Sequence, residues 1–226
     1  AIRNANDGIS LAQTAEGALG KVGDSLQRMR ELALQARNAS NSRSDKDSLD
    51  KEFGELAKEI QRVLGGTTFN GKNILATSGA GSQTFQVGAN TTADDSIDIS
   101  TTDLTTSTLI TTLAGTDSTG VGRAVIDSTA DAATLKTVID DIDQALDLVN
   151  AERATLGASQ SRFEAVIANL QIAAENQSAA RSRIMDADFA AETANLSRAQ
   201  ILQQAGTAMV AQANQVPQQV LRLLQG

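Results

Sequence analysis

One apolar residue returns at every seventh position in the second half of the chain. These positions are Leu135, Ile142, Val149, Leu156, Phe163 and Leu170. A seven-residue repeat keeps one side of a long helix against a neighbouring helix, as in a coiled coil. We therefore predict a helix over about 131–177, which at about 1.5 Å per residue would extend roughly 70 Å.

The N-terminal segment carries a second apolar seam, at alternating steps of four and three. It predicts a helix from about Asn4 to Asn38. The seam consists of Ala12, Ala15, Leu19, Val22, Leu26, Met29, Ala33 and Ala36. Four glycines, at positions 8, 17, 20 and 23, each cost roughly 1 kcal/mol inside a helix. Packing against other helices must therefore stabilise this segment.

A third helix is predicted to begin at Ser44, with Asp47 in the capping-box position. Its apolar positions are Leu49, Phe53, Leu56, Ile60 and Val63, and it should stop at Gly65-Gly66. Together the three seams predict an antiparallel helical bundle.

The region after this helix has the pattern of a small β-hairpin. Asn70-Gly71 is a tight-turn dipeptide. The segments 73–76 and 84–87 are predicted to be strands on either side of a Gly/Ser loop at 77–82.

Residues 91–130 change in composition and become rich in Thr. Ser96–Ser100 alternates between polar and apolar residues, as a strand does. Because large apolar side chains are few, this segment is predicted to form only a small satellite domain, with disorder of part of it as the alternative.

The C-terminal segment is predicted to be an amphipathic helix. Asp186 and Asp188 lie at its start, where carboxylates favour a helix N-terminus, and Pro217 should kink or end it. The large apolar residues singled out in it are Leu196, Ile201, Leu202, Met209, Val210, Val216, Val220, Leu223 and Leu224. Apolar residues at a chain end indicate burial in another chain or in an assembly.

The amino-acid composition argues against several classes of function. The chain has no His, Cys, Trp or Tyr, so we predict no enzyme activity and no catalytic, cofactor or metal site. The acidic pairs Asp94-Asp95, Asp140-Asp141 and Asp186-x-Asp188 are interpreted as capping or solvated residues. A net charge of −8 argues against nucleic acid as a partner. No segment approaches the roughly 20 apolar residues of a membrane-spanning helix.

Several runs of sequence resemble bacterial flagellin. Near the N-terminus these are residues 26–32 (LQRMREL), 68–71 (TFNG) and 85–89 (FQVGA). Near the C-terminus they are residues 180–184 (ARSRI), 197–205 (SRAQILQQA) and 211–217 (AQANQVP). The resemblance covers 1 to about 90 and about 131 to 226, while 91–130 carries none, as the variable outer domain of a flagellin would imply.

The resemblance implies a mainly α fold, an elongated antiparallel bundle or coiled-coil rod with a small β-hairpin and a small β-containing variable domain. Residues 1–90 would form the N-terminal half of the rod, 91–130 the variable outer domain, 131–180 the long C-terminal helix of the rod, and 181–226 the filament-core helix. It also implies a conserved N-terminal segment before Ala1, which would be the usual partner of the last helix.

The implied function is that of a secreted structural subunit, which self-assembles into the extracellular flagellar filament for motility. Its implied partners are other flagellin subunits, the export chaperone, and the filament cap and hook-junction proteins. The nine apolar residues of 196–224 named above would face the filament core or the chaperone. The alternatives are a hook–filament junction protein and a free-standing coiled-coil adaptor. A protease in the variable domain is excluded because a zinc-binding His-Glu-x-x-His helix needs His.

Two further expectations follow from the resemblance. Arg28, Leu32, Gln35 and Glu52 match the positions at which the vertebrate flagellin-sensing Toll-like receptor docks, with Leu32 as an exposed apolar anchor. The alternative is an ordinary solvated helix face. The Thr-rich segment 101–119 is either an O-glycosylation platform, as in some flagellins, or a flexible surface loop.

Overall fold

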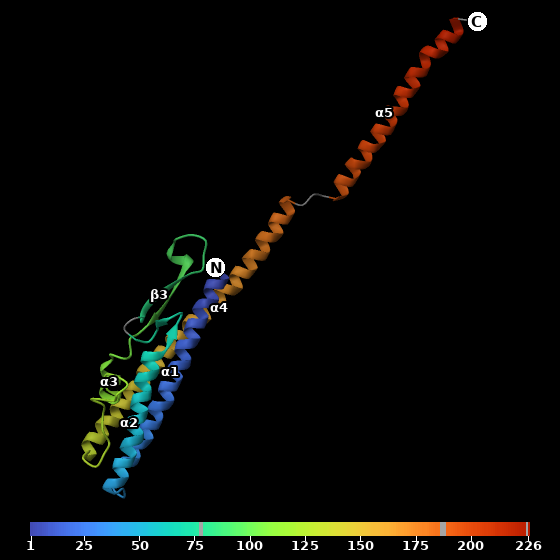
Figure 1. Ribbon diagram of the computed structural model, residues 1–226. Coiled ribbons are helices and arrows are strands. Elements are labelled where there is room, and N and C mark those ends of the chain that lie inside the picture. Colours follow the sequence, from blue (N-terminus) through green and yellow to red (C-terminus); the bar gives the residue numbers. More distant parts are fainter. Residues whose placement is uncertain (77–78, 186–188, 225) are drawn as a thin grey trace. The chain divides into compact units, whose positions relative to one another are not determined.

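The computed structural model describes residues 1–76, 79–185, 189–224 and 226, and side chains at all of these except 215–224. It divides into two units, Ala1–Ile172 and Ala173–Gly226, which are described separately. Figure 1 shows the elements in the order of the chain.

Three long helices form the bundle of the first unit: α1 (Ile2–Ala36), α2 (Arg43–Gly66) and the first part of α4 (Ala132–Met185). Successive contacts join Gly8 to Phe163, Glu16 to Arg153 and Arg30 to Asp143, so α1 and α4 run antiparallel. In Figure 1, α1 and α2 lie side by side with α4 along them. The predicted antiparallel bundle is confirmed.

The core follows the predicted seams. All eight predicted seam residues of α1 are buried, as are the heptad positions of α4 from Leu135 to Phe163, whereas Leu170 is only half-buried. In α2, Phe53 and Ile60 are buried, and the other three predicted positions pack partly buried against the core.

The start of α2 differs from the prediction. Its N-cap is Ser42, not Ser44: the Ser42 hydroxyl accepts a hydrogen bond from the Asp45 N–H at 3.2 Å, and the Asp45 carboxylate accepts the Ser42 N–H at 2.9 Å. Asp47, predicted to complete the cap, instead accepts the N–H of Ser128 at 3.0 Å.

The predicted tight turn is confirmed. Strands β1 (Thr68–Phe69) and β2 (Lys72–Asn73) pair antiparallel around Asn70 and Gly71, whose φ angles are 49° and 77°.

The predicted pairing of 73–76 with 84–87 is wrong. Strand β3 (Gly81–Gln86) pairs antiparallel with β4 (Ser96–Thr101), the strand predicted from its alternation. β4 is the better partner because Ile97 and Ile99 are buried on one face of it, which ties the hairpin to the core. Residues 77–78 of the predicted loop lie outside the described residues.

The segment 91–130 does not form a core of its own, contrary to the prediction of a satellite domain. It contains the short 3-10 helix η1 (Ala93–Asp95), β4 and α3 (Thr108–Ala114). Six of its large apolar side chains are buried in the same cluster as those of the bundle, whereas Val121 and Val125 are exposed. The six buried residues are Ile97, Ile99, Leu104, Ile110, Leu113 and Ile126. So few apolar residues are sufficient because each one adds to an existing core.

The second unit contains the end of α4 and the helix α5 (Phe189–Leu224). α4 extends past the predicted end near 177, to Met185. α5 continues through Pro217, so the prediction that this residue could end the helix is wrong. Asp186 and Asp188, predicted to begin it, lie outside the described residues. Within the described part of the chain, no helix is long and apolar enough to cross a membrane.

Candidate interaction surfaces

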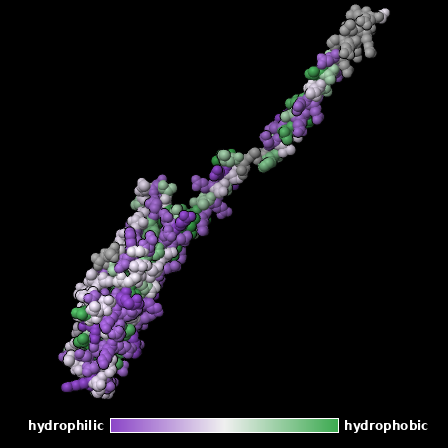
Figure 2. Space-filling view, in the orientation of Figure 1, coloured by the Kyte–Doolittle hydropathy of each residue, from purple (hydrophilic) through white to green (hydrophobic). Residues whose placement is uncertain are grey.

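Helix α5 exposes its apolar side chains. Every described side chain of α5 is exposed, and the large apolar ones have exposed fractions of 60–82%. They are Phe189, Leu196, Ile201, Leu202, Met209 and Val210. Figure 2 shows these hydrophobic patches interleaved with hydrophilic ones along the helix. A helix that exposes apolar side chains over most of its described length has the surface of a protein–protein contact.

The exposed residues of α5 contain a heptad seam that its large apolar residues alone do not reveal. Small residues at Ala199, Gly206 and Ala213 alternate, in steps of three and four, with Leu202 and Met209. This is a coiled-coil pattern in which the small positions let a partner backbone approach closely. A shallow hollow lies at Gly206, between Leu202 and Val210. The side chains of Val216, Val220, Leu223 and Leu224 lie outside the described residues.

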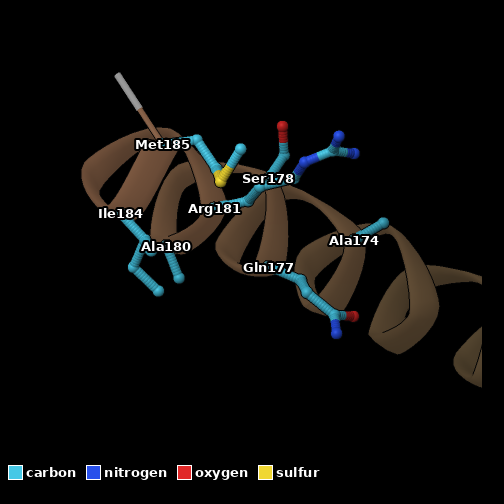
Figure 3. Close-up of a pocket in the computed structure, with 7 residues that line it drawn as sticks. All are labelled: Ala174, Gln177, Ser178, Ala180, Arg181, Ile184 and Met185. Atoms are coloured by element: carbon cyan, nitrogen blue, oxygen red, sulfur yellow. The ribbon is translucent and has the colours of Figure 1, made fainter. Parts of the chain in front are cut away.

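The end of α4 also exposes large apolar side chains. Ile184 and Met185 are 81% and 71% exposed. Figure 3 shows them on the last turn, beside a hollow whose other lining residues are Ala174, Gln177, Ser178, Ala180 and Arg181. All seven residues come from one helix, so this hollow is a helix surface rather than an enclosed ligand site.

On the first unit, two of the four predicted receptor residues form an ion pair. The Arg28 Nε donates to Glu52 Oε1 at 2.8 Å, and its Nη1 donates to Glu31 Oε2 at 2.9 Å. These hydrogen bonds, first with Glu52 and then with Glu31, raise the pKa of Arg28. Gln35 is exposed two turns further along α1. The structure therefore brings Arg28 and Glu52 together on one polar surface.

Leu32 is not the exposed anchor that we expected. Only 1% of it is exposed, because it follows Met29 by three positions and precedes Ala36 by four, and so faces the bundle with them. The exposed leucine nearby is Leu34, at 44%.

The acidic pairs serve as caps and ion-pair partners where the structure describes them. Asp95 forms a capping box with Thr92, and Asp140 pairs with Lys136 at 2.5 Å. Among the described residues, no group of three or more acidic side chains lies close enough together to hold a metal ion.

Comparison with known proteins identifies the family. The family model of the bacterial flagellin N-terminal helical region matches residues 1–80, and that of the C-terminal helical region matches residues 139–224. A flagellin of Halalkalibacterium halodurans is 45% identical over 99% of this chain and 77% of its own length. The chain belongs to the bacterial flagellin family.

Further relatives agree with this flagellin in sequence and fold. A flagellin of Xenorhabdus nematophila is 42% identical over 99% of this chain and 80% of its own. The crystal structure of Bacillus cereus flagellin has a TM-score of 0.61 and 34% identity, covering 80% of this chain and 95% of that one. Residues 81–138, which include β3, β4 and α3, lie outside both matched regions.

Family membership sets the general function. This flagellin is a structural protein and not an enzyme, and it polymerises with other flagellin subunits into the extracellular filament of the bacterial flagellum. Its exposed helical surfaces are therefore candidates for contacts with other proteins rather than for binding a substrate.

Proposed function

We propose that the heptad seam of α5 packs against neighbouring subunits in the core of the filament. The observation that carries this proposal is the exposure of Leu202 and Met209, at 65% and 69%, on the same seam as Gly206. Burial of such side chains stabilises an assembly by about 25 cal/mol per Å² of apolar surface. Because the seam runs from Ala199 to Ala213, the contact can extend over about four helical turns.

The charge distribution supports the same proposal. Residues 173–226 contain four acidic and four basic side chains, so this unit is formally neutral. Copies of a neutral helix can gather without the repulsion that a net charge would cause.

Before assembly, the same apolar surface would have to be kept from aggregating. We assign this role to the flagellin export chaperone, which holds α5 during secretion. The cap and hook-junction proteins then contact the subunits at the two ends of the filament.

Seam substitutions test the core contact. Leu202→Ser and Met209→Ser should each raise the critical concentration for polymerisation about tenfold or more, because each exchanges an apolar contact for a polar one. Gln204→Ser is the matched control, since position 204 lies opposite the seam. Sedimentation of polymer at equilibrium measures the effect, and equal critical concentrations for all three variants would refute the proposal.

The hook–filament junction is the alternative role. A junction protein would form a short, limited zone instead of a long polymer. Electron microscopy of the assembled protein separates the two roles, since filaments of indefinite length support the subunit role.

We further propose that Arg28, Gln35 and Glu52 form the surface recognised by the flagellin-sensing Toll-like receptor. Arg28 and Glu52 are each about half exposed and held in one geometry by their ion pair. Arg and carboxylate groups in a fixed arrangement are typical binding hot spots. Leu32 acts beneath this surface as a packing residue that positions α1.

Receptor signalling tests this surface. Arg28→Ala and Gln35→Ala should lower signalling potency while leaving the unfolding midpoint nearly unchanged, whereas Leu32→Ala should lower the midpoint. Lys21→Ala, exposed on the same helix, is the control. Full potency of the Arg28→Ala, Gln35→Ala double variant would rule the assignment out.

A further inference from the structure

The first unit exposes very few large apolar side chains. Apart from Ile172 at its end, those described as exposed are Val121, Val125 and Leu34, at 69%, 40% and 44%. Figure 2 shows that most of the visible surface of this unit is hydrophilic or neutral. Two of the three exposed residues lie only four positions apart, on the loop between α3 and α4.

This loop is fixed to α2 by a largely buried ion pair. Arg123 donates to the two carboxylate oxygens of Asp50 at 2.9 and 2.6 Å, and both side chains are less than one-fifth exposed. Asp50 also accepts the N–H of Ile126 at 2.9 Å. Val121 and Val125 lie on either side of this anchor, so their exposed positions are held by the structure.

The backbone also fixes Val121. It is flanked by Gly120 and Gly122, whose φ values of 75° and 77° are in the region that favours glycine. A Cβ on Gly120 would come within 3.3 Å of Lys58 on α2, so the loop lies close against that helix.

Leu34 lies on a different face of the bundle from the two valines, at a similar level along the bundle axis. One turn before it, Arg30 pairs with Asp143 of α4 at 2.6 Å, which places this face of α1 towards α4. The Arg28–Glu52 pair brings the 28–30 region of α1 level with the 50–52 region of α2, where the loop is anchored. Figure 1 shows the yellow-green loop region beside α2, with the blue α1 on the other side of α2.

The charges around the two apolar patches are complementary. Asp117 and Asp127 lie on the loop with the valines. Hydrogen bonds from Thr119 and Thr129 lower the pKa of these two carboxyl groups and keep them ionised. Arg37 follows Leu34 by three positions and is exposed.

We propose that Val121 and Val125 of one subunit dock beside Leu34 and Arg37 of a second copy of this chain in the filament. The two patches differ and lie on different faces, so the contact is heterologous, the type that propagates from subunit to subunit in a helical filament. The second copy is the partner because the chain polymerises, and because the acidic groups of one patch are complementary to the exposed Arg37 of the other. This inference rests on polymerisation and not on the α5 seam.

Disulfide crosslinking tests the contact without interference, because the chain has no native Cys. Filaments of the double variant Val121→Cys, Leu34→Cys are oxidised and run on a denaturing gel. A ladder of covalent dimers, trimers and larger species is expected, since two Cys on different faces link each subunit to two others.

A second Cys pair and the single Cys variants are the controls for this crosslink. Val121→Cys with Lys21→Cys should give no ladder, since position 21 lies about 20 Å from position 34 along α1. The single variants should remain monomeric. The absence of a ladder for the 121/34 pair would overturn the proposal, and dimers from Val121→Cys alone would show a symmetric contact instead.

If the Cys variants assemble poorly, the critical concentration for polymerisation of Ser variants tests the same contact. Val121→Ser and Leu34→Ser should each raise the critical concentration roughly fivefold, and the double variant should raise it by less than the product of the two. Fully multiplicative effects would mean that the two residues do not meet. Unchanged critical concentrations would indicate that another protein covers these patches.

Discussion

A single hydroxyl group determines where α2 begins. The segments Ser42-x-x-Asp45 and Ser44-x-x-Asp47 both fit the capping-box pattern, and the sequence gives no local reason to choose the first. In the structure the Asp47 carboxylate accepts a hydrogen bond from the N–H of Ser128, a residue 81 positions away. A choice that depends on so distant a partner could not be predicted from the local pattern.

The cap makes a residue-level prediction. Ser42→Ala should lower the free energy of unfolding by about 1 kcal/mol because it leaves the Asp45 N–H without its acceptor. Ser44→Ala, inside the first turn, should change it by less than about 0.5 kcal/mol. Urea unfolding followed by circular dichroism compares the two, and a larger loss for Ser44→Ala would contradict the observed cap.

Acid should weaken the turns of the first unit. Side-chain hydrogen bonds from Ser42, Thr119 and Thr129 lower the pKa of Asp45, Asp117 and Asp127 respectively. Because these pKa values are lower in the folded state, their stabilisation is complete above the ordinary carboxyl pKa of about 4 and is lost as the pH falls through the folded values.

This dependence is measured by urea unfolding near pH 7, 5 and 3. The unfolding midpoint should be similar at the two higher values and lower at the third. Asp117→Asn should reduce the acid-dependent loss. A midpoint that does not change between neutral and acidic solution would contradict the role given to these carboxylates.

At the scale of elements, small residues let helices and strands come together. Phe163 of α4 lies over Gly8 of α1, so that a Cβ there would come within 2.6 Å of its ring. The same ring meets Phe85 of β3 edge-on, with 5.7 Å between ring centroids. This junction joins α1, α4 and the β3–β4 hairpin.

Substituting glycines of α1 by alanine distinguishes the packed junction from the open surface of the helix. Gly8→Ala should destabilise the first unit by about 1–3 kcal/mol, because Phe163 must shift. Gly17→Ala, where nothing lies within 4 Å of the new Cβ, should stabilise it by up to about 1 kcal/mol. Thermal unfolding distinguishes the two, and the same sign for both would contradict the packing described.

The sequence predicts these elements unequally well. Helical seams such as Leu19–Val22–Leu26 repeat often enough for their periodicity to give both the helix and its buried face. Strand pairing has no such repeat: β3 selects β4 because Ile97 and Ile99 complete the core. The resemblance alone implies an exposed Leu32, whereas its spacing of three from Met29 indicates the core position that the structure shows.

At the scale of the molecule, charge is divided unevenly along the chain. Residues 173–226 are formally neutral, so residues 1–172 carry the whole net charge of −8. When subunits gather into a filament, their first units repel one another while their second units do not.

Polymerisation should therefore depend on salt. Raising the ionic strength from about 0.01 M to about 0.15 M shortens the screening length from about 30 Å to about 8 Å and should lower the critical concentration. Neutralising variants on exposed acids of the first unit, such as Glu31→Gln, should weaken this dependence. A critical concentration that rises with salt would contradict the account.

Methionine oxidation tests most directly whether other subunits bury α5 in the filament. The chain has three Met: Met29 is fully buried in the bundle, whereas Met209 on the α5 seam is 69% exposed. In the free subunit, peroxide should oxidise Met209 much faster than Met29, as peptide mass spectrometry would show. In the filament, we predict that Met209 becomes about as resistant as Met29; oxidation of Met209 at its free-subunit rate in intact filaments would contradict the central claim.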